Sequence, residues 1–238
     1  IQARHYPTDR EVDAAMVVCR HVLEHVTEPR ALLAAISGSV APGAQVPVYI
    51  EVPDADYMLE HPAIWDVIFE HHTYFSERSL RWLAESVGLK VTDAGRCFGD
   101  QYLWLEAVAD GSGPAQLAPV TGLPVALAAG FGDLLASTLT RWDDWVGAAQ
   151  GPVALWGAGS KGVTFLTAIG NATSIDFVID LNPRKHGLFV PGTGQCVVGP
   201  EVLEGHPDAS VLVMNPVYEA EIAAQLASMG WRGQLAVV

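Results

Sequence analysis

The stretch PVALWGAGSKGVTFLTAI, residues 152–169, decides the fold of the second half of the chain. Its opening letters, PVALW, form a short continuous apolar run, which is typical of a strand buried in a parallel sheet. The turn that follows reads G-x-G-x-x-G from Gly157 to Gly162, and a helical pattern begins at Lys161. A glycine turn between a strand and a helix leaves backbone N–H groups at the helix N-terminus, where they can bind a phosphate. This order predicts an open, Rossmann-like α/β domain.

The polar residues at the strand ends of this domain are candidates for binding a nucleotide. Further strands are expected at residues 175–179, 210–214 and 234–238, with a helix at residues 218–229. Ligands of such sheets lie at the carboxyl ends of the strands. The candidates there are Gly157, Gly159, Lys161, Asp180, Asn182, Lys185 and Asn215. Asp180 is placed to bind a ribose and Lys161 to lie beside a phosphate. Glycines kept only for tight strand–helix packing remain an alternative explanation of the turn.

The first half of the chain predicts a mixed α/β unit. Strands are expected at residues 14–19, 45–52, 90–98 and 101–109, and helices at residues 27–36 and 76–87. The run AAMVVC at residues 14–19 is typical of a strand buried on both faces. Thr27 and Ser76 are the expected N-caps of the two helices. The tight-turn pair Gly99-Asp100 predicts that the last two strands form an antiparallel hairpin at the edge of the sheet.

The domain boundary is expected between these two halves. Residues 110–124 are rich in Gly, Pro and Ala, which is typical of a linker. A helix at residues 125–149 follows, and Trp142 and Trp145 on one of its faces suggest packing against another surface. We therefore expect an α/β unit at residues 1–110, a linker with a helix at residues 111–150, and a Rossmann-like domain at residues 151–238.

Composition excludes several classes of partner. The chain has 238 residues, a hydrophobic fraction of 50% and a formal net charge of −14, so it is globular and poorly suited to binding a nucleic acid. No apolar run reaches membrane-spanning length, and no signal peptide opens the chain. The three cysteines form no CxxC pair, which favours a reducing, cytoplasmic setting. The chain also lacks an initiating methionine, and we expect it to be a fragment.

The stretch WDVIFEHHTYFS, residues 65–76, carries the densest set of reactive side chains. Glu70, His71 and His72 are adjacent, and Tyr74 follows in an aromatic surround. Imidazole titrates near neutral pH, and a neighbouring carboxylate can raise its basicity or fix its tautomer. This stretch is therefore a candidate for proton abstraction, for metal binding, or for a polar loop that leads into a helix.

A second polar set follows the first strand of the sheet. The sequence from His21 to His25 reads H-x-x-E-H, a pattern used by some zinc peptidases, but Pro29 forbids the long helix that such a site needs. We therefore expect no metal site here. Cys19, Arg20 and His21 instead lie at the carboxyl end of one strand and Glu51 at that of its neighbour, where a ligand is expected.

Several of these stretches resemble a known family. HVLEHVTEP at residues 21–29 resembles the turn after the fourth strand of class I S-adenosylmethionine-dependent methyltransferases. IEVPDADYMLEHPAIWDVIFEHHTYFSERSLRWLAESVGLKV and GDQYLWLEA resemble the C-methyltransferases that act on nucleotide-linked deoxysugars. WGAGSKGVTFLTAI, VIDLNPRKHGLFVPGTG and VLVMNP resemble the C-terminal domain of that family. The resemblance implies a partial class I methyltransferase sheet, a helical linker and a second Rossmann-like domain.

The resemblance also implies roles for individual residues. S-adenosyl-L-methionine would be the cofactor, with Cys19, Arg20 and His21 on its edge of the sheet, and zinc would belong only to a preceding domain that is absent from this chain. His71 would be the general base, with Glu70 beside it and His25 as a second active-site histidine. Glu51 and Tyr74 would face a small nucleotide-linked keto substrate. An NAD-dependent oxidoreductase using residues 157–162 and a non-catalytic nucleotide-binding module remain the alternatives.

Overall fold

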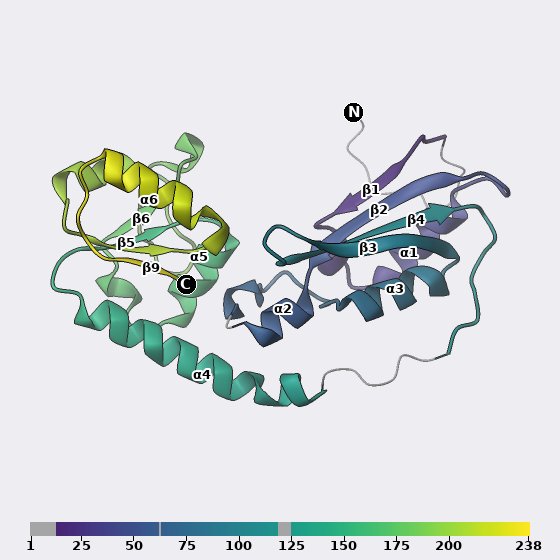
Figure 1. The fold of residues 1–238 in the computed structure, drawn as a ribbon, viewed down its shortest axis with the longest axis horizontal. Coiled ribbons are helices and arrows are strands. Elements are labelled where there is room, and N and C mark those ends of the chain that lie inside the picture. The colour runs from purple at the N-terminus through teal and green to yellow at the C-terminus, as the bar shows by residue number, and fades with distance from the viewer. Residues whose placement is uncertain (1–12, 62, 119–124) are drawn as a thin grey trace. The chain divides into compact units, whose positions relative to one another are not determined.

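The structure is a computed structural model that describes residues 13–61, 63–118 and 125–238 (Figure 1). It divides into two compact units that do not follow the order of the chain. The first comprises Ile1–His61 and Phe69–Leu127, and the second comprises Pro62–Ile68 and Ala128–Val238. The expected division placed residues 62–68 with the first half, whereas the contacts place them with the second.

The first unit is a mixed four-stranded sheet with helices. In chain order its elements are β1 (Val17–Arg20), α1 (Pro29–Gly38), β2 (Val46–Pro53), α2 (Ala55–Glu60), α3 (Glu77–Ser86), β3 (Leu89–Cys97) and β4 (Tyr102–Ala109). A short 3-10 helix at Leu23–His25 follows β1. The strand order is β1-β2-β4-β3, in which β1 and β2 are parallel and β4 is antiparallel to both β2 and β3. The antiparallel edge hairpin expected from the sequence is thus confirmed.

Helices α1 and α3 lie beside this sheet and share its core (Figure 1). Leu33 of α1 and Leu80 of α3 are buried together with Ile50 and Leu105 of the central strands. The expectation that the first strand is buried on both faces is wrong, because burial alternates along β1 and Val18 is 55% exposed. Hydrophobic composition alone could not show that one face of this strand lacks a covering layer among the described residues.

The helix starts show which capping signals operate. Helix α1 begins at Pro29, with Glu28 as the N-cap residue, and not at the expected Thr27. Proline suits the first helical position because it has no N–H to leave unsatisfied. Helix α3 begins directly after Ser76 as expected, and Ser76 and Ser79 form a reciprocal capping box. The start of α3 therefore fixes the chain a few residues after His71 and His72.

The second unit contains a five-stranded parallel sheet. Its elements are α4 (Val125–Ala148), β5 (Val153–Trp156), α5 (Ser160–Ala168), β6 (Phe177–Ile179), β7 (Val197–Val198), β8 (Ser210–Val213), α6 (Glu219–Ser228) and β9 (Leu235–Val237). The order β7-β6-β5-β8-β9 with parallel pairing throughout confirms the Rossmann-like α/β fold. Strand β7 was not predicted, because two residues are too few to show a periodic pattern. Short 3-10 helices complete the unit at Ile64–Asp66, Ala172–Ser174, Pro183–Lys185, Pro200–Gly205 and Pro216–Tyr218.

Each face of this sheet packs into its own core. Helices α4 and α5 contribute Trp142 and Phe165 to one core, and α6 contributes Leu226 to the other. Trp65 belongs to the first of these cores, and its ring lies edge-on to Phe165 with centroids 4.9 Å apart. This aromatic contact explains why residues 62–68 pack with the second unit. Within the described part of the chain, no helix combines the length and apolarity needed to cross a membrane.

Candidate active site

The site begins at a sharp turn at the carboxyl end of β1. His21 has a φ of +50°, which is uncommon for a residue with a Cβ atom and is often found at functional sites. Its backbone N–H donates to the Glu51 carbonyl at 2.9 Å, which holds the turn against β2. The 3-10 helix Leu23–His25 follows at once, so Glu24 and His25 are placed by rigid backbone and not by a long loop.

Residues 69–75, which we call the histidine loop, are fastened to this turn. The N–H groups of His72 and Thr73 donate to the Glu24 carbonyl at 2.8 and 3.3 Å. At the end of the loop, Phe75 is buried and forms a parallel bridge with Asp54, just beyond β2. Segments 45 residues apart in sequence, those of His25 and Glu70, are thereby brought into contact.

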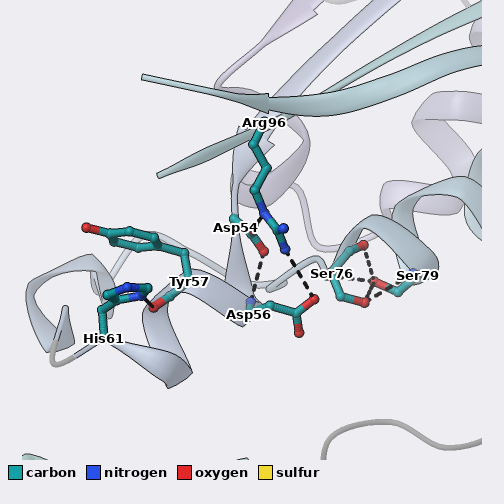
Figure 2. A network of polar contacts seen from close by, with 7 residues as sticks. All are labelled: Asp54, Asp56, Tyr57, His61, Ser76, Ser79 and Arg96. Atoms are coloured by element: carbon teal, nitrogen blue, oxygen red, sulfur yellow. Dashed lines mark hydrogen bonds and ion pairs between the residues drawn. The ribbon is translucent and has the colours of Figure 1, made fainter. Parts of the chain in front are cut away.

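Polar contacts around Asp54 and around Ser76 lie where the histidine loop ends (Figure 2). The Asp54 side chain accepts from the Asp56 N–H at 2.9 Å and so caps α2. Arg96 reaches over from β3 and donates its Nε–H to Asp54 at 2.5 Å. The ion pair satisfies the buried Asp54 carboxylate, and Ser76 with Ser79 caps α3 beside it. These contacts therefore fix the end of the histidine loop, where Phe75 pairs with Asp54 and α3 begins.

His25 and His71 meet within this frame. Their ring centroids are 4.8 Å apart with an interplanar angle of 69°, and the His71 and Tyr74 centroids are 6.0 Å apart. The Nδ1 atom of His25 lies 3.1 Å from the Glu70 carbonyl oxygen. A carbonyl oxygen can only accept, so this contact puts the proton on Nδ1 and leaves a lone pair on Nε2 of the neutral ring. The structure thus brings together two of the three predicted catalytic side chains.

Glu70 contributes in a way that the sequence did not indicate. Its side chain is exposed, as is that of His72, and it is the Glu70 backbone carbonyl that contacts His25. The carboxylate at the centre of the cluster belongs to Glu24, whose side chain is only 2% exposed. Glu24 Oε1 lies 3.4 Å from His21 Nδ1 and 3.9 Å from His25 Nε2. Its place inside the H-x-x-E-H pattern was the one sequence signal that could have identified it.

The strand ends beside the cluster form a second polar group around Glu51. Glu51 accepts hydrogen bonds from Arg20 and from the Tyr49 hydroxyl, both at 2.8 Å, and lies 3.0 Å from His21 Nε2. Burial acts to raise the pKa of Glu51, but the hydrogen bonds from Arg20 and Tyr49 outweigh it and the pKa is lowered. The hydrogen bond to Glu24 raises the pKa of His21.

The three predicted cofactor residues differ in what they can offer a ligand. Arg20 and His21 keep exposed side chains, at 58% and 36%. Cys19 instead points into the core of the first unit, and burial raises the pKa of its thiol to about 11. Cys19 therefore offers no side chain to a ligand at the strand end.

The polar side chains of the predicted nucleotide site in the second unit are engaged by other groups of that unit. Asp180 accepts from Lys185 at 2.7 Å, from the Ala158 N–H at 3.1 Å and from the Asn182 N–H at 2.9 Å. Lys161 forms an ion pair with Asp66 at 3.0 Å. The Asn215 side chain accepts from the Val217 N–H at 3.1 Å and caps its own turn. The glycine turn, Asp180, Asn182 and Lys185 do meet, but through contacts within the protein.

The glycines of this turn differ in their surroundings. A Cβ atom on Gly162 would overlap the carbonyl oxygen of Gly157, whereas one on Gly159 would meet open space. Gly162 is thus required for close packing of the turn against the helix. This agrees with the alternative explanation of the motif, in which its glycines serve strand–helix packing.

Two family matches agree with this architecture. Residues 3–94 match the family described as methyltransferase domain, and residues 140–238 match the family described as C-methyltransferase C-terminal domain. The two matches lie in the order that the sequence resemblance implied. The first part of the chain is therefore similar to methyltransferase domains, and its last part to the C-terminal domain of C-methyltransferases.

One relative and two solved structures complete the comparison. The chain is 26% identical over 224 residues to the C-methyltransferase NovU of Streptomyces niveus, covering 88% of this chain and 53% of that protein. It therefore spans about half the length of this relative.

Among solved structures, a Haloferax volcanii complex between a methyltransferase activator and a methyltransferase gives a TM-score of 0.36 at 16% identity, over 48% of this chain and 60% of the other. A 16S rRNA (adenine(1408)-N(1))-methyltransferase from Catenulisporales acidiphilia gives 0.29 at 18% identity, over 43% and 52%. These TM-scores are too low to support an inference about the site.

Proposed function

We propose that this chain is the catalytic and C-terminal part of an S-adenosylmethionine-dependent C-methyltransferase that acts on a carbon next to a keto group. The observation that carries the proposal is the meeting of His25, His71 and the Glu24 carboxylate at the carboxyl end of β1. A C–H bond next to a carbonyl loses its proton only to a well-placed base, and a neutral imidazole suits this task near neutral pH.

His71 is the base in this proposal. It lies on the histidine loop, which is held by the Glu24 carbonyl, so its replacement removes no part of the buried core. When its ring accepts the substrate proton it becomes a cation, which the nearby Glu24 carboxylate stabilises. His25, held by the Glu70 carbonyl, lines the other side of the reacting carbon. Tyr74 completes the wall and is placed to contact the substrate.

The chain offers one edge of a cofactor site. The exposed Arg20 and His21 side chains and the backbone of Cys19 fit the polar groups of S-adenosyl-L-methionine at the open end of β1. When bound there, the cofactor supplies the methyl group. Glu51 orients Arg20 and His21 through its hydrogen bonds and so sets this edge.

The substrate that we propose is a small nucleotide-activated keto sugar, and the pathway that uses it is deoxysugar biosynthesis. The resemblance of residues 50–91 and 99–107 to the C-methyltransferases that act on nucleotide-linked deoxysugars supports this class, and a net charge of −14 weighs against a nucleic acid. The free thiols of Cys19, Cys97 and Cys196 are consistent with a reducing cytoplasm as the setting. The alternative NAD-dependent oxidoreductase loses support because Asp180, the expected ribose ligand, is engaged by Lys185 and two backbone N–H groups.

The decisive experiment replaces His71 in the full-length enzyme. We expect His71→Ala to lower single-turnover methylation by about 10²–10⁴-fold, the usual contribution of a general base. Exchange of the substrate proton into deuterated water, measured without cofactor, should fall in parallel. His72→Ala is the matched control, because His72 is the exposed neighbour, and it should keep both rates. Exchange at the wild-type rate in His71→Ala would transfer the role of the base to His25.

A further inference from the structure

The same three side chains have the composition of a metal site. Glu24, His25 and His71 each place one ligand atom within 4.8 Å of the others. Two imidazole nitrogens and one carboxylate oxygen form a donor set that Zn²⁺ and related divalent transition-metal ions prefer. Ions of this kind bind such atoms at about 2.0–2.2 Å. Binding would therefore draw the three ligand atoms closer together than they lie in the structure.

His25 is already oriented as a metal ligand. The contact of Nδ1 with the Glu70 carbonyl at 3.1 Å leaves the Nε2 lone pair free to bind, and Nε2 is the atom that lies 3.9 Å from Glu24. Metal-bound histidines usually donate their other ring N–H to a carbonyl or carboxylate, which fixes the ring and raises its basicity. The Glu70 carbonyl fills this supporting role.

Glu24 supplies the second observation that points to a cation. Its side chain is 2% exposed, yet Oε2 is buried and has no hydrogen-bond partner among the described residues. A buried carboxylate oxygen without a partner is costly. A cation bound between Glu24 and the two imidazoles would satisfy it. The Glu24 carbonyl also fastens the loop that bears His71, so one residue organises all three ligands.

The H-x-x-E-H pattern thus contributes two ligands and not three. His21 is not among the three, because its Nδ1 lies 3.4 Å from Glu24 Oε1 while its Nε2 is engaged by Glu51 at 3.0 Å. His71, from a distant loop, takes the third position. The sequence argument against a zinc site rested on a continuous helix, and a site that combines the 3-10 helix with the histidine loop does not need one.

We propose that Glu24, His25 and His71 bind a divalent transition-metal ion, with Zn²⁺ the closest chemical match and a water molecule in the open position. The binding itself does not depend on the proposed methyl transfer. If both hold, metal and substrate proton compete for His71, so that bound metal lowers the rate of methylation.

Cobalt provides the direct test, because Co²⁺ replaces Zn²⁺ and reports its coordination in the visible spectrum. We expect titration of the 238-residue chain with Co²⁺ to give visible absorption bands with a one-to-one endpoint, and Zn²⁺ to abolish them. Glu24→Gln, His25→Ala and His71→Ala should each weaken the affinity at least 10-fold. The controls are His72→Ala and Cys196→Ser, which remove an exposed imidazole and an exposed thiol and should leave the spectrum unchanged.

Two results would overturn the proposal. One is the absence of cobalt bands in a chain whose circular dichroism shows it to be folded. The other is equal affinity in the wild type and in folded His25→Ala and His71→Ala. Methylation by the full-length enzyme is measured separately, so wild-type activity in His71→Ala together with weakened cobalt binding would count against the proposed base and not against the metal site.

Discussion

The two sheets of this protein both end in polar side chains, but they use them differently. At the end of β1 and β2, His21 and His25 keep partly exposed rings, and one oxygen of Glu24 has no hydrogen-bond partner among the described residues. At the ends of β5 and β6, Asp180 is engaged by three donors of its own unit. The first arrangement retains the capacity to bind or react, whereas the second is satisfied without a ligand.

This difference shows that a sequence motif does not by itself identify a group of side chains that can still bind a ligand. The G-x-G-x-x-G turn and Asp180 have the order of a dinucleotide fingerprint, yet Lys185 occupies the carboxylate that would bind a ribose. The cluster around Glu24 has no comparably complete sequence motif, yet it gathers two imidazoles and a buried carboxylate. Groups whose bonding capacity is unused are thus a better guide to chemistry than the pattern of the loop.

The comparison depends on the division into two units, and Trp65 gives the strongest test of that division. Trp65 is 2% exposed and packs on Phe165 of the second unit, although it lies before the histidine loop in sequence. We expect Trp65→Ala to destabilise the second unit by about 3–5 kcal/mol, as large-to-small changes in a core do. Hydrogen exchange should increase in β5 and β8 and remain nearly unchanged in β2 and β4.

Phe69→Ala is the matched control, four positions further along and 98% exposed. It should change stability by less than about 0.5 kcal/mol. If Trp65→Ala loosened β2 and β4 instead, residues 62–68 would belong with the first unit and the comparison would need new boundaries.

The glycine turn provides a smaller test. It asks whether this turn of the second unit serves close packing and not the binding of a ligand. Gly162→Ala places a Cβ atom on the Gly157 carbonyl oxygen and should destabilise the second unit by about 1–3 kcal/mol. Gly159→Ala should be nearly neutral, because its Cβ atom meets open space. Urea denaturation of both variants measures the difference. Equal stability of the two variants would show that the turn can yield, and would reopen the possibility of a ligand there.

Much of the fold follows from local sequence signals. The strands, the N-cap at Ser76 and the hairpin turn at Gly99-Asp100 depend on neighbouring residues, and each was found close to its expected position. Strand β7 was missed because it has two residues and is defined by its pairing with β6. The placement of Trp65 was missed because a single aromatic side chain does not indicate which core it will enter.

The site was predicted in part, for a related reason. His25 and His71 were expected from motif resemblance and do meet. The role of Glu24 depends on burial and on a backbone contact to a loop 48 positions away (24 to 72), neither of which a local pattern encodes. The functions assigned to these residues remain predictions.

The smallest expected effect compares one aspartate–lysine pair in each unit. Asp110 of the first unit accepts from Lys90 and from the Ser112 N–H, and these contacts lower its pKa to about 2. Asp180 of the second unit also has a lowered pKa, because the hydrogen bond from Lys185 and those from backbone N–H groups outweigh the opposing effect of burial. In the unfolded chain the pKa of an aspartate is about 3.9.

A carboxyl group with a lower pKa in the folded state stabilises the protein while it is ionised, and this stabilisation is lost on protonation. The stability difference between wild type and Asp110→Asn should therefore be full above about pH 4 and disappear as the pH falls towards about 2. It should be small and should shrink with added salt, because Lys90 is 63% exposed and solvent screens the pair. The stability difference between wild type and Asp180→Asn should show the same dependence on pH. Its effect on hydrogen exchange should be confined to β5 and β6. A stability difference between wild type and variant that stayed constant between pH 2 and 5 would mean that these carboxylates act by shape and not by charge. The Lys185–Asp180 ion pair would then not stabilise the strand ends of the second unit.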